Sequence, residues 1–472
     1  MRSSTHLPAD RGDQDRTTHP HAAAAPADLD PRAGRAAPSQ PAPTRRTRPS
    51  RAVALVAAGL TAALALTACG SSGATGGSSA AADSKDLEVF SYLTSGSEAD
   101  ALNAMFDVYR KQYPDVAVQN GAVSGGGGAN AAQVLQSRIA GNDAPAVWQA
   151  HPGANLATYA KGGLLEDLTP MFDQEGWTSK YPTDYLDGLK YDGKIYGVPF
   201  GINQMNLVWW NKPVAEKLGV DVGTDLTWDQ MTAAAAKAKA AGVTPYCLGD
   251  KDPFTTGEIL ESAIIAHLGA DGWKKLTAGQ IKWDDPGVTA GLNDYAAIYA
   301  DANPDHSALT WDQSAKKFAT GGCLFLPLVD SAYGEFLKNG AKEGSDFGFV
   351  YYPGTADVIL NVSDIWVVSA KKPDGANADN FVKVAGSPDA QLAYQKIKGQ
   401  IPPRLDADVS SLGAYQKAFA EHYKSATVLQ SLTFGQSNAP AVQQAFYDAI
   451  TAFNTSKDVN AFTAAMNAAM NG

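Results

Sequence analysis

Residues 86–120 read DLEVFSYLTSGSEADALNAMFDVYRKQYPDVAVQN, and they combine two short apolar runs with a helical pattern between them. The runs at 86–91 and 116–123 have the length and residue types of β-strands. The segment at 98–114 predicts a helix that ends at its proline, because proline cannot continue a helical hydrogen-bond ladder. One face of this helix is apolar at helical spacing and is expected in the core: Leu102, Met105, Phe106 and Tyr109.

The same alternation continues beyond this stretch, with a second helical pattern at 130–141 and a third strand at 144–151. Strands that alternate with helices predict an α/β fold with a parallel sheet. Residues 193–211 predict two strands interrupted at Pro199–Gly201, where we expect the chain to cross into a second lobe. After this point the pattern restarts, with further helices at 227–242, 254–268, 310–322, 377–387 and 440–470 and strands at 323–329, 346–353 and, in two pieces, 358–370.

The chain is acidic, with a formal net charge of −11. The residues before Cys69 carry more basic than acidic side chains, so the remainder is more acidic still. Because nucleic-acid binding requires a basic face, the charge argues against a nucleic-acid partner. Residues 86–472 exceed the usual size of one domain, which predicts two lobes.

The segment RPSRAVALVAAGLTAALALTAC, residues 48–69, joins basic residues to an apolar run that ends at a cysteine. The run is shorter than the ~20 apolar residues of a membrane-spanning helix. Residues 45–68 therefore predict a signal peptide. Leu66–Cys69 resembles the lipobox of bacterial lipoproteins, which implies that Cys69 is lipidated and anchors the protein to the membrane. The alternative is an ordinary secretory cleavage site beside a chance cysteine.

Composition also describes the segments on either side of this signal. Residues 69–85, rich in Gly, Ser and Ala, predict a flexible tether. Residues 1–44 show no apolar period and are expected to be either disordered or an over-extended start of translation. Cys247 and Cys323 either pair as a disulfide or remain two small buried residues. The cysteines and histidines have no metal-ligand spacing, and we expect neither a metal nor a cofactor.

Several motifs together resemble the extracellular solute-binding proteins of bacterial carbohydrate ABC importers. YDGKIYGVPFGINQMNLVWWN at 191–211 and TWDQM at 227–231 are similar to the broad group, and VWQAHPG at 147–153 and KGQIPPRLD at 398–406 to its glucose/mannose-binding members. The resemblance implies two α/β lobes joined by hinge strands, as in periplasmic binding proteins. We expect residues 86–200 and 358–400 in lobe 1, and 201–357 and 401–472 in lobe 2.

The resemblance also implies a function and a set of sugar-binding residues. We expect the lobes to close around glucose or a related aldohexose outside the cell, and the closed form to meet the permease subunits of an importer. A short oligosaccharide is the alternative ligand, because Leu93 and Phe434 replace a tryptophan and a histidine of the family. The residues carried over as sugar ligands are Tyr92, Glu98, Gln149, His151, Trp311, Asp364 and Lys398.

Other residues have open assignments. Asn203, Asp330, Trp366 and Arg404 either contact the sugar or serve the structure. Trp228 and Trp311 both follow a threonine in TWDQ, and we expect Trp228 to pack and Trp311 to stack on the ligand. No GxSxG or HExxH motif is present, so we expect a protein that is not an enzyme. A lipoprotein glycoside hydrolase is the alternative function.

Overall fold

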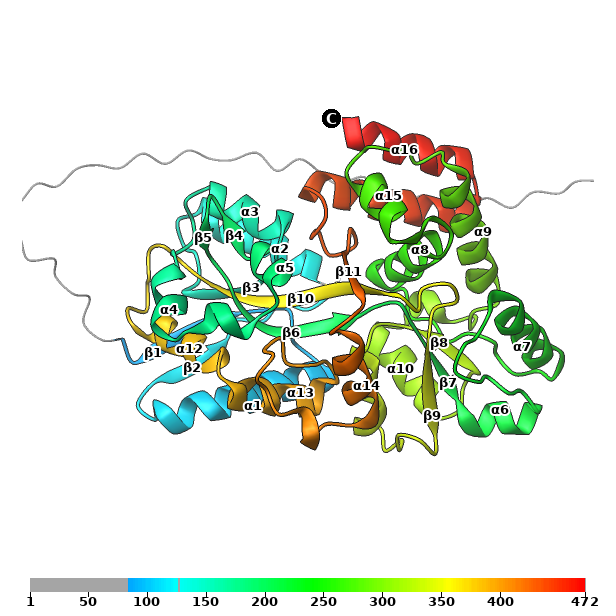
Figure 1. Cartoon of the computed structure of the whole chain (residues 1–472), viewed down its shortest axis with the longest axis horizontal. Coiled ribbons are helices and arrows are strands. Elements are labelled where there is room, and N and C mark those ends of the chain that lie inside the picture. Colours follow the sequence, from blue (N-terminus) through cyan, green and yellow to red (C-terminus); the bar gives the residue numbers. More distant parts are fainter. Residues whose placement is uncertain (1–83, 126–127, 472) are drawn as a thin grey trace, which may run out of the picture. The chain divides into compact units, whose positions relative to one another are not determined.

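The computed structural model describes residues 84–125 and 128–471, which form a two-lobe α/β fold (Figure 1). The predicted N-terminal extension (1–44), the signal peptide (45–68), Cys69 and most of the tether (69–85) lie outside the described residues. Among the described residues, no helix is both long and apolar enough to span a bilayer.

A mixed six-stranded sheet carries the predicted strand–helix–strand unit. Its order is β11-β10-β3-β1-β2, and β6 also pairs with β10. Strand β1 pairs in parallel with both β2 and β3, as the alternation predicts, whereas β10 runs antiparallel to β3 and β6. The bounds are β1 Asp86–Phe90, β2 Ala117–Asn120, β3 Val147–Ala150, β6 Val198–Gln204, β10 Val358–Val368 and β11 Thr427–Gln430.

Strand β10 connects the two parts of the fold. One edge of β10 pairs with β11 over residues 358–361 and with β3 over residues 365–368. The other edge pairs with β6 over residues 361–366, with a register shift between Asp364 and Ile365. Between β11 and β3, the first edge is thus free of strand partners around Val362–Asp364, and Val362 and Asp364 line the cavity described below.

Two strand predictions in this region need correction. Residues 358–370 were expected as two pieces, but β10 is one continuous strand. Pro199–Gly201 does not interrupt the strand as expected. This segment lies within β6, at the register shift with β10. Strand β6 ends at Gln204, so the interruption between the two strands falls at Met205–Asn206. A bulge is a position at which a strand tolerates proline. Pro199–Gly201 therefore indicated a bulge within the strand and not the end of the strand.

A smaller antiparallel sheet has the order β8-β7-β9. Its strands are β7 Leu207–Asn211, β8 Phe325–Pro327 and β9 Phe347–Tyr351, and a separate two-stranded ribbon joins β4 Lys190–Tyr191 to β5 Lys194–Ile195. Strand β11, from the range expected for lobe 2, is hydrogen-bonded to β10, from the range expected for lobe 1. The exact lobe boundaries therefore remain a prediction.

Helices cover both faces of the larger sheet. Figure 1 shows α1 and α13 on one side and α2 and α3 on the other. The predicted face of α1 is buried at Leu102, Met105, Phe106 and Tyr109. The bounds in the first part of the chain are α1 Gly96–Gln112, α2 Ala129–Ala140, α3 Ala154–Lys161, α4 Thr169–Gln174, α5 Thr183–Asp187, α6 Lys212–Leu218 and α7 Trp228–Ala240.

The remaining helices surround the smaller sheet and return to the larger one. The predicted helix at 440–470 is two helices, because the chain turns at Lys457 with φ 54°. The helix predicted at 254–268 ends at Gly269, whose φ of 67° is not helical and is a value that glycine adopts without strain; α8 continues beyond this break to Thr277. The bounds are α8 Phe254–Thr277, α9 Pro286–Ala300, α10 Trp311–Ala319, α11 Ser331–Lys338, α12 Asn377–Ala385, α13 Pro388–Lys398, α14 Ala414–His422, α15 Pro440–Ser456 and α16 Val459–Asn471.

Candidate functional site

A cavity of about 310 Å³ lies over the gap in the edge of β10. Segments far apart in sequence meet there: the loop after β1, the start of α1, the loop before α8, the start of α10 and the end of α13. Six of the residues predicted from the sequence line it: Tyr92, Glu98, Asn203, Trp311, Asp364 and Lys398. The volume is at the lower end of the ~300–1,000 Å³ range of small-molecule sites.

The carboxylate of Asp364 is the centre of a polar network in this cavity. Its Oδ1 accepts hydrogen bonds from Gln149 Nε2 at 2.8 Å and from the Tyr92 hydroxyl at 3.1 Å. Its Oδ2 accepts from Asn203 Nδ2 at 3.3 Å and from Gln400 Nε2 at 3.1 Å. Three amides and a phenol therefore surround a single acid. Such groups both donate and accept, as the hydroxyls of a ligand do.

His151 lies beside this network in a neutral state. Its Nδ1 is 2.8 Å from the carbonyl oxygen of Ser363, which accepts a hydrogen bond from it. Nε2 is then the unprotonated nitrogen, and the Tyr92 hydroxyl lies 3.4 Å away. Burial lowers the pKa of His151, because the charged form loses hydration. His151 and Gln149 line a second cavity, next to the first, which is described further below.

A buried ion pair forms one wall of the first cavity. Lys398, at the end of α13, pairs with Glu98 in the first turn of α1 and donates to Ser331 Oγ at 2.7 Å. Its ammonium lies 5.6 Å from the ring centroid of Trp311, within the range of a cation–π contact. Burial raises the pKa of Glu98, and the Lys398 ammonium opposes that shift. Glu98 and Lys398 both come from the range expected for lobe 1, and Ser331 comes from the range expected for lobe 2.

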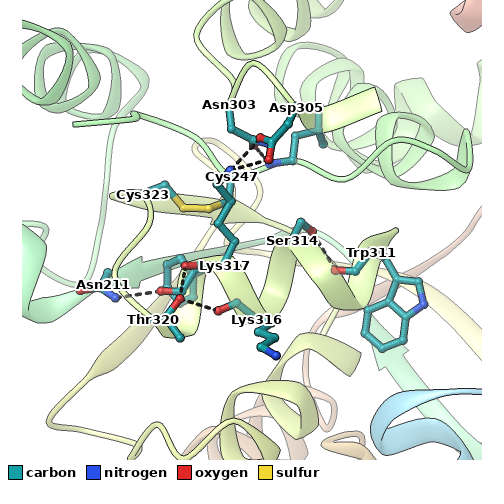
Figure 2. The surroundings of a disulfide bond; sticks show 12 residues. Asn211, Cys247, Asn303, Asp305, Trp311, Ser314, Lys316, Lys317, Thr320 and Cys323 are labelled. Carbon is teal, nitrogen blue, oxygen red and sulfur yellow. Dashed lines mark hydrogen bonds and ion pairs between the residues drawn. A yellow bond between two sulfur atoms is a disulfide. The ribbon is translucent and has the colours of Figure 1, made fainter. Parts of the chain in front are cut away.

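Trp311 is the first residue of α10, and only 8% of its surface is exposed. The Gln313 side chain accepts a hydrogen bond from the Thr310 amide at 3.0 Å and fixes the start of this helix. Figure 2 shows the indole at one end of α10, away from the disulfide. The disulfide joins Cys247 to Cys323, with Cα atoms 5.6 Å apart. The structure thus selects the paired alternative for these cysteines.

Three residues with open assignments are not among those that line the cavity. Asp330 is fully buried. Its carboxylate accepts hydrogen bonds from the backbone amide of Gln204 at 3.0 Å and from the Tyr415 hydroxyl at 3.2 Å. Trp366 stacks on Phe200, with ring centroids 4.4 Å apart. Arg404 pairs with Asp406 and donates to the carbonyl of Gly386. In this structure, the contacts of all three are internal to the fold.

Trp228 also lies elsewhere, as expected. It lines a separate hollow, where its ring is 6.4 Å from that of Tyr352. The repeated TWDQ motif therefore places its two tryptophans in different surroundings.

The cavity includes residues that sequence reasoning missed. Asp252 lines it just before α8, and Phe254 lines it as the first residue of that helix. Ser331 lines the cavity as well. It follows the strand predicted at 323–329, which contains β8, and a polar residue after the carboxyl end of a strand was a usable signal for a binding site. Phe254 lies 5.8 Å from Phe434, whose ring meets His151 edge-on at 5.6 Å. The aromatic wall is thus Phe254 and Phe434, in addition to Trp311.

Two buried carboxyl groups of α8 hold parts of the cavity wall. Glu258 accepts from the amide of Val329 at 3.2 Å. Glu261 accepts from the amides of Leu432 and Thr433 at 2.6 and 2.8 Å, immediately before Phe434. Burial raises the pKa of Glu261 from 4.5 to about 7. Among the described residues, no cluster of three or more His, Cys, Asp or Glu residues could hold a metal ion.

The comparisons with known proteins agree on one family. The sequence profile of the bacterial extracellular solute-binding proteins matches residues 95–392. An uncharacterized ABC transporter extracellular-binding protein of Pyrococcus horikoshii is 32% identical over 381 residues, which cover 80% of this chain and 85% of that protein. A probable sugar-binding periplasmic protein of Brucella suis is 30% identical over 382 residues, covering 79% of this chain and 88% of that protein.

The fold has solved counterparts. The structure of a chitin oligosaccharide binding protein matches with a TM-score of 0.71 and 20% identity, over 83% of this chain and 100% of that chain. At this identity the likeness concerns the two-lobe fold.

Proposed function

The chain belongs to the bacterial extracellular solute-binding protein family, and from this we propose that it captures a sugar outside the cytoplasm and delivers it to the permease of an ABC importer. We place the sugar in the cavity of about 310 Å³ between the lobes. Within this class of ligand, we propose glucose or a related aldohexose.

The network around Asp364 is the observation that carries this proposal. A pyranose presents a rim of hydroxyls and two faces of C–H groups. The carboxylate and its neighbour Asn203, which both line this cavity, supply acceptors and donors for the hydroxyls. Trp311 and Phe254, in the same wall, supply apolar surface for the C–H groups. The printed name of the Brucella suis relative, a probable sugar-binding protein, supports the same class of ligand.

The proposed mechanism is closure of the lobes around the sugar. Tyr92 and Glu98 approach the cavity from one side, and Phe254 and Trp311 approach it from the other. A ligand that contacts both sides favours the state in which they are close together. Strands β6 and β10 cross between the lobes and supply the hinge.

We further propose that the protein is held at the outer face of the cell membrane through lipid on Cys69. The segment that follows Cys69, whose Gly, Ser and Ala content predicts a tether, would let the two lobes reach the permease. A single acyl chain binds membranes only marginally, so more than one chain is expected on this cysteine.

Calorimetric titration of the purified chain with glucose, mannose and galactose tests the proposal. We expect saturable binding in the micromolar range, about −8 kcal/mol, without conversion of the sugar. Asp364→Asn removes one acceptor of the network and should weaken binding at least about tenfold, the scale of one hydrogen bond to a charged group. Asp294→Asn is the matched control, because this acid pairs with His267 outside the cavity.

Two results contradict the proposal. One is the absence of saturable heat with these sugars and with short oligosaccharides, from a protein that still unfolds cooperatively. The other is turnover: release of shorter sugars from an oligosaccharide would identify a glycoside hydrolase instead.

A further inference from the structure

A second cavity of about 370 Å³ adjoins the first. It lies between α2, the end of β3 and the start of α15. Tyr92, Gly128 and Phe434 line both cavities. The two spaces are therefore neighbours that share these bordering residues, and each has the volume to hold a group of similar size.

The chemistry of this second cavity differs from that of the first. Among the described residues that line it there is no Asp, Glu, Lys or Arg, and its histidine, His151, has a pKa lowered by burial. An ionic ligand would thus lack a counter-charge there. Instead the cavity is rich in side-chain amides: Gln133, Gln136, Gln149, Asn155, Gln443 and Gln444.

Two of these amides are available to a ligand. Gln133 and Gln136 are exposed side chains of α2, and in the described part of the chain neither makes a hydrogen bond. The others are partly engaged: Asn155 accepts from the His151 amide at 3.0 Å, and Gln443 donates to Thr433 at 2.7 Å. An amide offers both a donor and an acceptor, so it can match a hydroxyl in either role.

We propose that the second cavity is a subsite for a second sugar unit, so that the ligand is a neutral disaccharide or a longer oligosaccharide. The inference rests on the proposed function, because it assumes that the first cavity holds a sugar ring. The uncharged lining restricts the second unit to neutral sugars, and acidic or amino sugars are disfavoured there. Tyr92 and Phe434, which border both cavities, lie where the linkage between the two units would pass.

The experiment compares one-ring and two-ring ligands on the same protein. The purified chain is titrated calorimetrically with glucose, maltose and cellobiose, and so is the double variant Gln133→Ala/Gln136→Ala. Both positions are exposed on a helix and alanine favours helices, so the fold should be retained. Ser137→Ala is the control, because Ser137 is exposed on the same helix and does not line the cavity.

We expect at least one of the two disaccharides to bind at least about tenfold tighter than glucose, because added hydrogen bonds contribute at this scale. The double variant should lose about tenfold in disaccharide affinity and keep its glucose affinity, and Ser137→Ala should change neither. Glucose binding as tight as that of both disaccharides would overturn the subsite, as would an equal loss for glucose and disaccharide in the double variant. If the parent chain binds none of these three sugars and also neither mannose, galactose nor other short oligosaccharides, the proposed function itself is overturned.

Discussion

Removing the cross-link between Cys247 and Cys323 should cost the protein several kilocalories per mole of stability. The two residues are separated by 76 positions in the sequence, and the cross-link restricts the unfolded chain over that loop. The chain-entropy relation for a loop of this length gives about 4.5 kcal/mol at 25 °C. This is an upper value, because residual structure in the unfolded chain already removes part of the entropy.

Urea unfolding of the oxidised and the reduced parent chain measures this loss. Both sulfurs are fully buried, so the reductant is added in urea and the chain is then refolded by dilution with reductant present. The double variant Cys247→Ala/Cys323→Ala should unfold like the reduced parent and should not respond to reductant. The slope of the unfolding free energy against urea should rise without the cross-link, because the unfolded chain then exposes more surface. A difference below about 1 kcal/mol between oxidised and reduced parent would refute the entropic reasoning.

Three further predictions concern the cavity, a buried acid and the N-terminal cysteine. Trp311→Ala should weaken sugar binding by about 2 kcal/mol in calorimetric titration, whereas Trp228→Ala, at the same place in the repeated motif, should leave it unchanged; the opposite order would show that the wrong tryptophan was assigned. The folded protein holds the proton of Glu261 up to a pKa of about 7, so stability should fall by up to about 3 kcal/mol as pH rises from 4.5 through 7. Urea unfolding across this range should show a flatter profile for Glu261→Gln, and an unchanged profile would contradict the assignment. Cys69→Ser should move the protein from the membrane fraction to the soluble fraction, and continued sedimentation with membranes would exclude the lipid anchor.

Local signals predicted those parts of the fold that local interactions determine. The apolar face of α1 is buried as expected, because one amphipathic helix needs only a core to pack against. The helix predicted at 227–242 begins with a capping box that Thr227 and Gln230 form within four residues of chain. Strand β10 was misread as two pieces because Ser363 and Asp364 interrupt its apolar run. Both are buried: Asp364 lines the cavity, and the Ser363 hydroxyl is hydrogen-bonded to Asn361.

The site was harder to predict because its parts are distant in sequence. Gln149 and Asp364, which share a hydrogen bond, are separated by 215 positions, and no periodic pattern connects them. Family resemblance brought these residues together, and residue chemistry alone did not. Phe254 was missed for the opposite reason: an apolar residue at the start of a helix is ordinarily part of the core, and only the three-dimensional structure shows its contact with Phe434.

The register shift of β10 at Asp364 and Ile365 has a mechanical consequence. The proposed hinge includes this position, and a hinge is displaced least when two bodies move, so the acid at the centre of the polar network would shift little as the lobes close. A sugar bound to Asp364 would therefore lie beside the proposed hinge. Trp311 and Phe254, which line the same cavity and come from the range expected for lobe 2, would move relative to this point. In the proposed mechanism, the hydroxyls of the ligand would thus meet an acceptor that stays in place, whereas closure would bring up the aromatic walls that enclose its C–H faces.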